Sequence, residues 1–275
     1  MRVASSGETP AILQFLMAHE ATSMFPIGNL LGQGPPTESW LFTDANRITG
    51  YLGLTDQGIL LPQAPMADWA NIRQTLAGKR VSGIVGPCLQ ARALRSALGL
   101  AATPARLDKD ETGYSLALNA LHQPDCTGFH LSEIHDSSLE LVTSWRKAAL
   151  IETMGFTPQT AGAEAGAQVL AWQSQNRHRI LWQDQTPLAL AGFNAEIPGA
   201  VQVGGVYTPP ELRNRGYSRR AVGLGLAEAR ARGILRAYLF TSSLAAARAY
   251  TALGFHRSHD FTLLMFAAAQ EVTGP

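Results

Sequence analysis

The stretch at residues 203–222 constrains the fold most, because it predicts a strand, a tight turn and the start of a helix in immediate succession. Valine and tyrosine at residues 203–207 favour a strand, and the paired Gly204 and Gly205 within it indicate a β-bulge or a close approach of a ligand to the backbone. Two prolines then end the strand, since neither can donate to a ladder. From Tyr217 onward apolar residues return at helical spacing. We expect the rest of the chain to support this unit.

The turn at residues 213–218 joins a glycine, Gly216, to flanking arginines. A helix N-terminus has unpaired N–H groups and a partial positive charge, so a turn of this kind offers a cradle for an anion. Residues 211–236 contain seven arginines and two glutamates, a local charge that the whole chain lacks at a formal net charge of +1. These features predict a phosphorylated cofactor. An ordinary strand-to-helix connection with solvated arginines is the alternative.

This turn resembles the pyrophosphate loop of the GNAT superfamily of acyl-CoA-dependent N-acetyltransferases, whose pattern is Gln/Arg-x-x-Gly-x-Gly/Ala. Arg213 and Gly216 match the pattern, whereas Ser218 stands where glycine or alanine is usual. Downstream, a strand-like run at residues 237–241, an alanine-rich run that ends at Tyr250 and a Leu-Gly-Phe turn resemble the next strand, helix and turn of the superfamily. The match therefore extends well beyond a single motif.

The resemblance, which covers about residues 130–266, implies acetyl-CoA as the cofactor. Backbone N–H groups of the bulged strand would hold the pantetheine arm and polarise the thioester oxygen, which is oxyanion-type stabilisation. Ser243 stands where the family often has an asparagine that contacts the cofactor arm. The implied cofactor-binding residues are Gly205, Val206, Tyr207, Arg213, Asn214, Arg215, Gly216, Tyr217, Ser218 and Ser243.

Acyl transfer to an amine requires that the amine lose a proton and that the departing thiolate gain from a donor. Tyr250 fits the donor role by its resemblance-derived position, with a half-buried aromatic on an apolar helix face as the alternative. The strand at residues 200–207 has no carboxylate, so Glu196 on the neighbouring strand is the nearest candidate for a base. A solvated hairpin residue, with water relaying the proton to bulk, is the alternative for Glu196.

Together these implications describe an N-acetyltransferase that transfers an acetyl group from acetyl-CoA to a primary amine of a small molecule, by direct attack in a ternary complex. Two alternatives remain open. One is glycine-N-acyltransferase-like acyl transfer to an amino acid, and the other is a non-catalytic acyl-CoA-binding regulatory protein.

Composition argues against several other classes of protein. With 275 residues, 46% hydrophobic and 16% charged, the chain is globular and long enough for two modest domains. A net charge of +1 argues against nucleic-acid and membrane-surface partners. Cys88 and Cys126 are far apart and predict no metal site. No signal-like or membrane-spanning apolar run is present, which predicts a cytoplasmic protein, and we expect a monomer or homodimer.

The order of predicted elements indicates an α+β fold, with a mostly antiparallel sheet flanked by helices and two domains in tandem. In the first half, a helix from Thr9, a three-strand meander and a helix at residues 67–77 resemble a reduced version of the second half. Residues 62–68 between them contain no arginine and no glycine, so this domain is expected to be GNAT-like without a cofactor loop. A linker-like composition at residues 119–128 gives domains at 1–120 and 130–275.

Two helices predicted at residues 138–154 and 163–176 open the second domain. In the superfamily this helical pair borders the acceptor site, so four of its residues are candidate neighbours of the substrate: Trp145, Glu152, Glu164 and Trp172. Core packing or solvation is the alternative for each.

Overall fold

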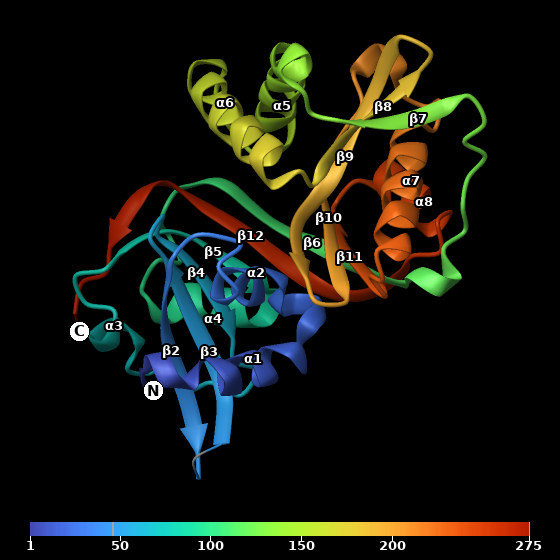
Figure 1. Ribbon diagram of the computed structural model, residues 1–275. Helices are drawn as coiled ribbons and strands as arrows, with labels where there is room; N and C mark the ends of the chain where they lie inside the picture. The colour runs from blue at the N-terminus through green and yellow to red at the C-terminus, as the bar shows by residue number, and fades with distance from the viewer. Residues whose placement is uncertain (46, 275) are drawn as a thin grey trace. The chain divides into compact units, whose positions relative to one another are not determined.

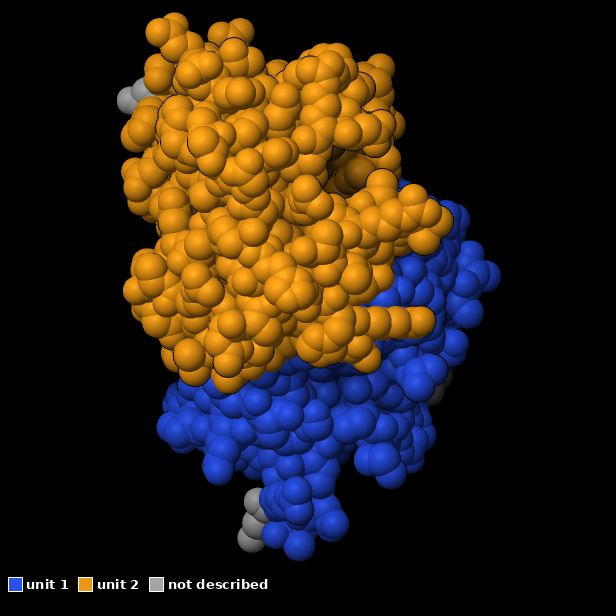
Figure 2. Space-filling model, turned by 90° about the vertical axis from the view of Figure 1, so that its right-hand side faces the viewer, with its two compact units in different colours: residues 1–113, 259–275 blue, residues 114–258 orange. Residues whose placement is uncertain are grey.

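The computed structural model describes residues 1–45 and 47–274 and shows a mixed α+β protein (Figure 1). The chain forms two compact units, coloured separately in Figure 2. Unit 1 contains Met1–Gly113 and His259–Pro275, and unit 2 contains Tyr114–Ser258. Two long strands, β6 (Ala105–Ala117) and β12 (His256–Glu271), contribute residues to both units. Within the described residues, no helix is long and apolar enough to cross a membrane.

The strands of unit 1 follow the order β1-β2-β3-β4-β5-β12-β6, and β6 contributes only its first part. The meander of β2, β3 and β4 is antiparallel, as the sequence predicts, while β4 and β5 run parallel. Besides β12, its elements are β1 (Arg2–Val3), α1 (Thr9–Met17), α2 (Glu20–Leu30), β2 (Thr37–Asp44), β3 (Arg47–Thr55), β4 (Ile59–Gln63), α3 (Ile72–Thr75), β5 (Arg80–Pro87), α4 (Cys88–Ala97) and the first part of β6.

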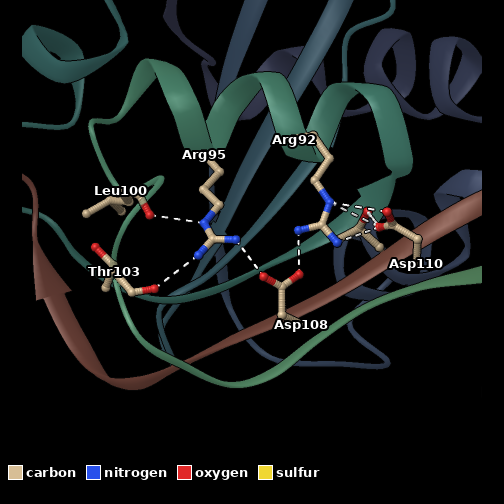
Figure 3. Close-up of polar contacts among 7 residues, drawn as sticks. Arg92, Arg95, Leu100, Thr103, Asp108 and Asp110 are labelled. Carbon is tan, nitrogen blue, oxygen red and sulfur yellow. Dashed lines mark hydrogen bonds and ion pairs between the residues drawn. The ribbon is translucent and has the colours of Figure 1, made fainter.

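An ion-pair network holds α4 against β6 within unit 1 (Figure 3). Arg92 pairs with Asp108 and, at 2.7 Å, with Asp110, and Arg95 reaches Asp108 at 2.6 Å. Arg95 also donates to the backbone oxygens of two loop residues, which closes the turn between α4 and β6. The charged run at residues 108–111 is therefore part of a strand, although its polarity is typical of a loop.

Two features of unit 1 differ from the sequence prediction. The helix predicted at residues 67–77 is only the four-residue α3, and the segment before it is an irregular connection that packs Trp69 into the core. The second feature is β12, whose residues 261–271 pair antiparallel with β5. Its buried Leu264 and Phe266 complete the apolar core of unit 1. The C-terminal strand β12 therefore belongs to the sheet of unit 1, which no local sequence pattern predicts.

Unit 2 contains five strands in the order β11-β10-β9-β8-β7, besides parts of β6 and β12. Its elements are β7 (Phe129–Glu133), α5 (Leu139–Thr153), α6 (Pro158–Gln175), β8 (His178–Gln183), β9 (Thr186–Ile197), β10 (Ala200–Tyr207), α7 (Tyr217–Ala231), β11 (Arg236–Thr241) and α8 (Leu244–Thr251). The β9–β10 hairpin turns at Pro198 and Gly199, as predicted, with a positive φ of 81° at the glycine.

Helices cover both faces of the unit 2 sheet (Figure 1). On one face α7 and α8 share a core with the sheet, centred on Val201, Leu226 and Leu239. On the other face α5 and α6 share a second core that includes Ile180 and Leu190. Helix α6 begins five residues earlier than the sequence predicts, because Thr157 and Thr160 form a capping box and proline takes the first helical position.

Candidate functional site

Strand β10 is bulged and partly unpaired at the glycines that the sequence singles out. Its register against β9 shifts between Gly204 and Tyr207, and Gly205 has a φ of +63°, which only glycine adopts without strain. On its other side β10 pairs with β11 only as far as Gln202, opposite Tyr238. The predicted β-bulge is confirmed. Backbone N–H and C=O groups beyond Gln202 are therefore placed to pair with an extended ligand.

The turn after β10 leads into the open N-terminus of α7. Asn214 and Gly216 have φ values of +64° and +74°, and Gly216 directly precedes the first helical residue, Tyr217. The N–H of Arg220 donates to the oxygen of Gly216 at 3.0 Å, so the N–H groups before it have no acceptor within the helix. Alternating backbone conformations that expose successive N–H groups form anion-binding concavities. The turn can therefore hold a phosphate group.

Two arginines flank this turn, and sequence reasoning did not single them out. A Cβ at Gly216 would lie 3.2 Å from Nη1 of Arg220 and 3.8 Å from Nη2 of Arg219. Arg220 is fixed by hydrogen bonds to the backbone oxygens of Arg215 (3.0 Å) and Asp125 (2.8 Å). The Nε of Arg219 is buried and has no partner among the described residues. Both guanidinium groups are thus held beside the backbone cradle.

Arg213, in contrast, is engaged elsewhere. Its guanidinium forms a bidentate ion pair with Glu152 on α5, at 2.7 and 2.8 Å, and lies 5.8 Å from the ring centroid of Tyr207. This pair lowers the pKa of Glu152, since the guanidinium stabilises the carboxylate. The side chain of Arg213 therefore connects the turn to α5. At this residue only the backbone is available to a ligand.

Helix α8 carries the next two predicted residues. The hydroxyl of Ser243 caps α8 by accepting from the N–H of Ala246 at 3.3 Å. Tyr250 is buried in the core shared by α7 and α8, with its ring edge-on to Phe255 at 6.0 Å. Ser243 thus stabilises the N-terminus of α8. The packing around Tyr250 holds its ring in one position, as a proton donor requires.

Glu196 lies at the hairpin end of β9, opposite Val201 of β10. It pairs at 3.2 Å with Arg232, the residue that follows α7. Gly205 is four residues further along β10 than Val201, or about 13 Å at the usual rise of a strand. The structure therefore does not bring Glu196 together with the bulge.

An aromatic group lies on the α5/α6 face, beside the bulge. Trp145 and Tyr207 have ring centroids 6.3 Å apart, and Trp172 belongs to the same buried cluster. Glu164 is eight residues before Trp172 on α6 and accepts a hydrogen bond from Gln168 at 2.6 Å. Of the four candidate substrate neighbours, the two tryptophans are buried here, while Glu152 is held by its ion pair.

His178 is a third residue that sequence reasoning missed. It is 1% exposed, its imidazole stacks on Trp172 at 3.9 Å, and neither ring nitrogen has a partner among the described residues. A Cβ at Gly205 would lie 2.5 Å from its Nε2, and a Cβ at Gly192 would collide with the same ring. Burial lowers the pKa of His178 to about 3, so the ring is neutral at physiological pH. The sequence signal for this buried ring is the pair of glycines, Gly192 on β9 and Gly205 on β10, that leave space for it.

In unit 2 a mixed sheet is covered by helices, and its bulged strand β10 diverges from β11 and leads into the open N-terminus of α7. Residues 145–255 match the family model described as Acetyltransferase (GNAT) family. This part of the chain is a GNAT acetyltransferase domain, as the resemblance of about residues 130–266 implies. The family supports acyl transfer in general. Comparison with curated protein sequences finds no match.

Solved structures resemble the whole chain. An acetyltransferase from the GNAT family of Colwellia psychrerythraea has 13% identity and a TM-score of 0.56, covering 96% of this chain and 98% of that one. A tandem GNAT protein from the clavulanic acid biosynthesis pathway has 13% identity and a TM-score of 0.59, covering 100% and 98%. A GCN5-related N-acetyltransferase from Sphaerobacter thermophilus has 17% identity and a TM-score of 0.58, covering 100% and 95%. The chain therefore has a tandem GNAT fold.

Proposed function

We propose that this protein is an N-acetyltransferase that transfers an acetyl group from acetyl-CoA to the primary amine of a small molecule, in a ternary complex. The observation that carries the proposal is the divergence of β10 from β11 after Gln202, in a strand that leads directly to the turn at Gly216. A family match over residues 145–255 gives independent support.

The residues of unit 2 fit such a cofactor. Acetyl-CoA would supply an activated acyl thioester. The backbone at Gly205, Val206 and Tyr207, which lies beyond the last residue paired with β11, would pair with the pantetheine arm, and the backbone of residues 213–218 would hold the pyrophosphate. Arg219 and Arg220, which flank Gly216, would add charge-assisted hydrogen bonds to the phosphates.

Proton transfer is assigned to one side chain and to solvent. Tyr250 is proposed as the donor to the departing thiolate, since its ring is held by the core of unit 2. Glu196 pairs with Arg232 far from the bulge, so we assign removal of the amine proton to water rather than to this carboxylate. His178, whose pKa is about 3, is too weak a base to hold that proton near neutral pH.

We assign the cofactor to unit 2 alone. In unit 1 the connection at residues 64–71 has neither an arginine nor a glycine, and the helix after it has only four residues. The degenerate N-terminal domain, the cytoplasmic location, the monomeric or homodimeric state and the absence of nucleic-acid and membrane partners belong to the same proposal.

Calorimetric titration of acetyl-CoA into the wild type and into Gly216→Glu tests the proposal. A carboxylate at the cradle would repel the pyrophosphate, so binding by this variant should be lost. Gly216→Ala has the same backbone strain without the charge, and Gly162→Glu adds the same charge on α6, where nothing lies within 4 Å of the new Cβ. Acetyl-CoA that fails to bind the wild type, or binds Gly216→Glu equally well, refutes the proposal.

A further inference from the structure

Arg146 of α5 is a half-buried cation in the α5/α6 cluster. The carbon of its guanidinium lies 5.0 Å from the ring centroid of Trp172, and its Nε donates to Oε1 of Gln168 at 2.6 Å. Gln168 in turn donates to Glu164 at 2.6 Å. Burial lowers the pKa of Arg146 to about 10, which still leaves the group protonated at neutral pH. The side chain is thus charged in a place where its charge is costly.

Arg146 differs in its partner from three arginines of unit 2 that form ion pairs. Arg213 pairs with Glu152, Arg232 with Glu196, and Arg179 with Glu228 and Glu133. Among the side chains that the structure describes, no carboxylate forms a direct ion pair with Arg146, and Glu164 acts on it only at longer range, where it opposes the lowering of its pKa. A neutral amide leaves most of its donors to solvent or to a ligand, since a guanidinium has five N–H groups. An arriving carboxylate would be matched in charge and geometry.

The position of Arg146 connects it to the bulge. Trp172 lies under its guanidinium and stacks on His178, whose Nε2 is directed at Gly205. His178 is buried, and both its ring nitrogens are unpartnered within the described chain. Arg146, Trp172 and His178 therefore form a continuous stack of side chains that ends at Gly205 of the bulge, and Arg146 is its partly exposed member.

We propose that the acceptor is an amine that carries a carboxylate, and that Arg146 binds this carboxylate while the amine lies toward the bulge at Gly205. This inference rests on the proposed function, because it names the substrate class of the same site. Trp172 and His178 are buried between Arg146 and Gly205, so they hold the guanidinium at a fixed position relative to the bulge.

The test is a titration of matched probes in the absence of acyl-CoA. Phenylalanine and 2-phenylethylamine differ by one carboxylate, and phenylalaninamide replaces that carboxylate by a neutral group. Wild-type protein should bind phenylalanine at least about tenfold more tightly than either neutral probe, as expected for a charge-assisted pair. The same preference should appear in the rates of CoA thiol release with the three acceptors.

Variants assign the preference to Arg146. Arg146→Gln should bind all three probes alike, Arg146→Lys should keep part of the preference, and Arg248→Gln, which changes an exposed arginine of α8, should keep all of it. Equal affinity of the wild type for the charged and neutral probes, or binding by none of them, overturns the inference, as does a preference that survives in Arg146→Gln. Because the titration needs no acyl-CoA, loss of cofactor binding would refute the proposed function without affecting this result.

Discussion

Replacing Gly205 by alanine tests the geometry of the bulge directly. The new Cβ would lie 2.5 Å from Nε2 of His178 and 3.2 Å from Cη2 of Trp172. The imidazole has no room to move aside, because it stacks on Trp172 and closely approaches Gly192. Alanine would also have to adopt the left-handed φ of +63°.

The backbone strain and the collision with His178 together determine how much stability Gly205→Ala should lose. A left-handed backbone costs a residue with a Cβ about 1–2 kcal/mol. Overpacking of a filled core costs about 1–3 kcal/mol. Gly205→Ala should therefore lower the free energy of unfolding by about 2–5 kcal/mol, a large part of the stability of an ordinary domain.

Urea unfolding followed by tryptophan fluorescence measures the effect, and a second substitution separates the two costs. In the background of His178→Ala the collision disappears and only the backbone cost remains, so Gly205→Ala should cost about 1–3 kcal/mol less there. Gly225→Ala is the control, since its Cβ would meet only Phe193 at 4.0 Å and alanine inside a helix should stabilise by about 0.5–1 kcal/mol. Wild-type stability of Gly205→Ala, or costs that simply add, would refute the reasoning.

Three further outcomes are expected. The folded pKa of His178 is about 3 against an ordinary 6.5, so the unfolded chain takes up the proton first. Stability should then fall by up to about 1.4 kcal/mol per unit as pH drops from about 6.5 toward 3, and urea titrations of His178→Phe should lack this component. Tyr250→Phe should lower kcat by roughly 100-fold in thiol-release assays while calorimetry shows unchanged acetyl-CoA affinity. Gly162→Ala on α6 has free space around its Cβ and should raise the urea midpoint, with a gain of about 1 kcal/mol.

Local patterns were enough to predict the strand, bulge, turn and helix at the centre of unit 2. Prolines and glycines act on their own backbone, so β10 and α7 end and begin close to where the sequence places them. The helix predicted at residues 67–77 was too long, because only Ile72–Thr75 are helical and the segment before them packs Trp69 into the core. In α6 a Thr-Pro pair that resembles a break is instead a helix start.

The side chains of the candidate site were harder to predict, because their environment comes from distant residues. His178 is buried by Trp172 on a helix and by glycines on two other strands. Glu152 and Arg213 pair across 61 positions of sequence, which removes the arginine side chain from the cradle that its motif suggests. Backbone-based parts of the site can be read from sequence, while charge pairing requires the fold.

Shortening the chain tests the assignment of β12 to unit 1. Ending the protein at Asp260 removes Leu264, Phe266 and Val272, which are all buried in the core of unit 1 and together contribute roughly 5–9 kcal/mol at 1.5–3 kcal/mol each. This loss is as large as the stability of a typical domain, and it also exposes the edge of β5. Hydrogen exchange should show that amides of β3 and β5 lose protection while those of β9 and β10 keep it. A chain that ends at Thr273 is the control, and unchanged protection of β5 in the shorter chain would show that unit 1 does not depend on this strand.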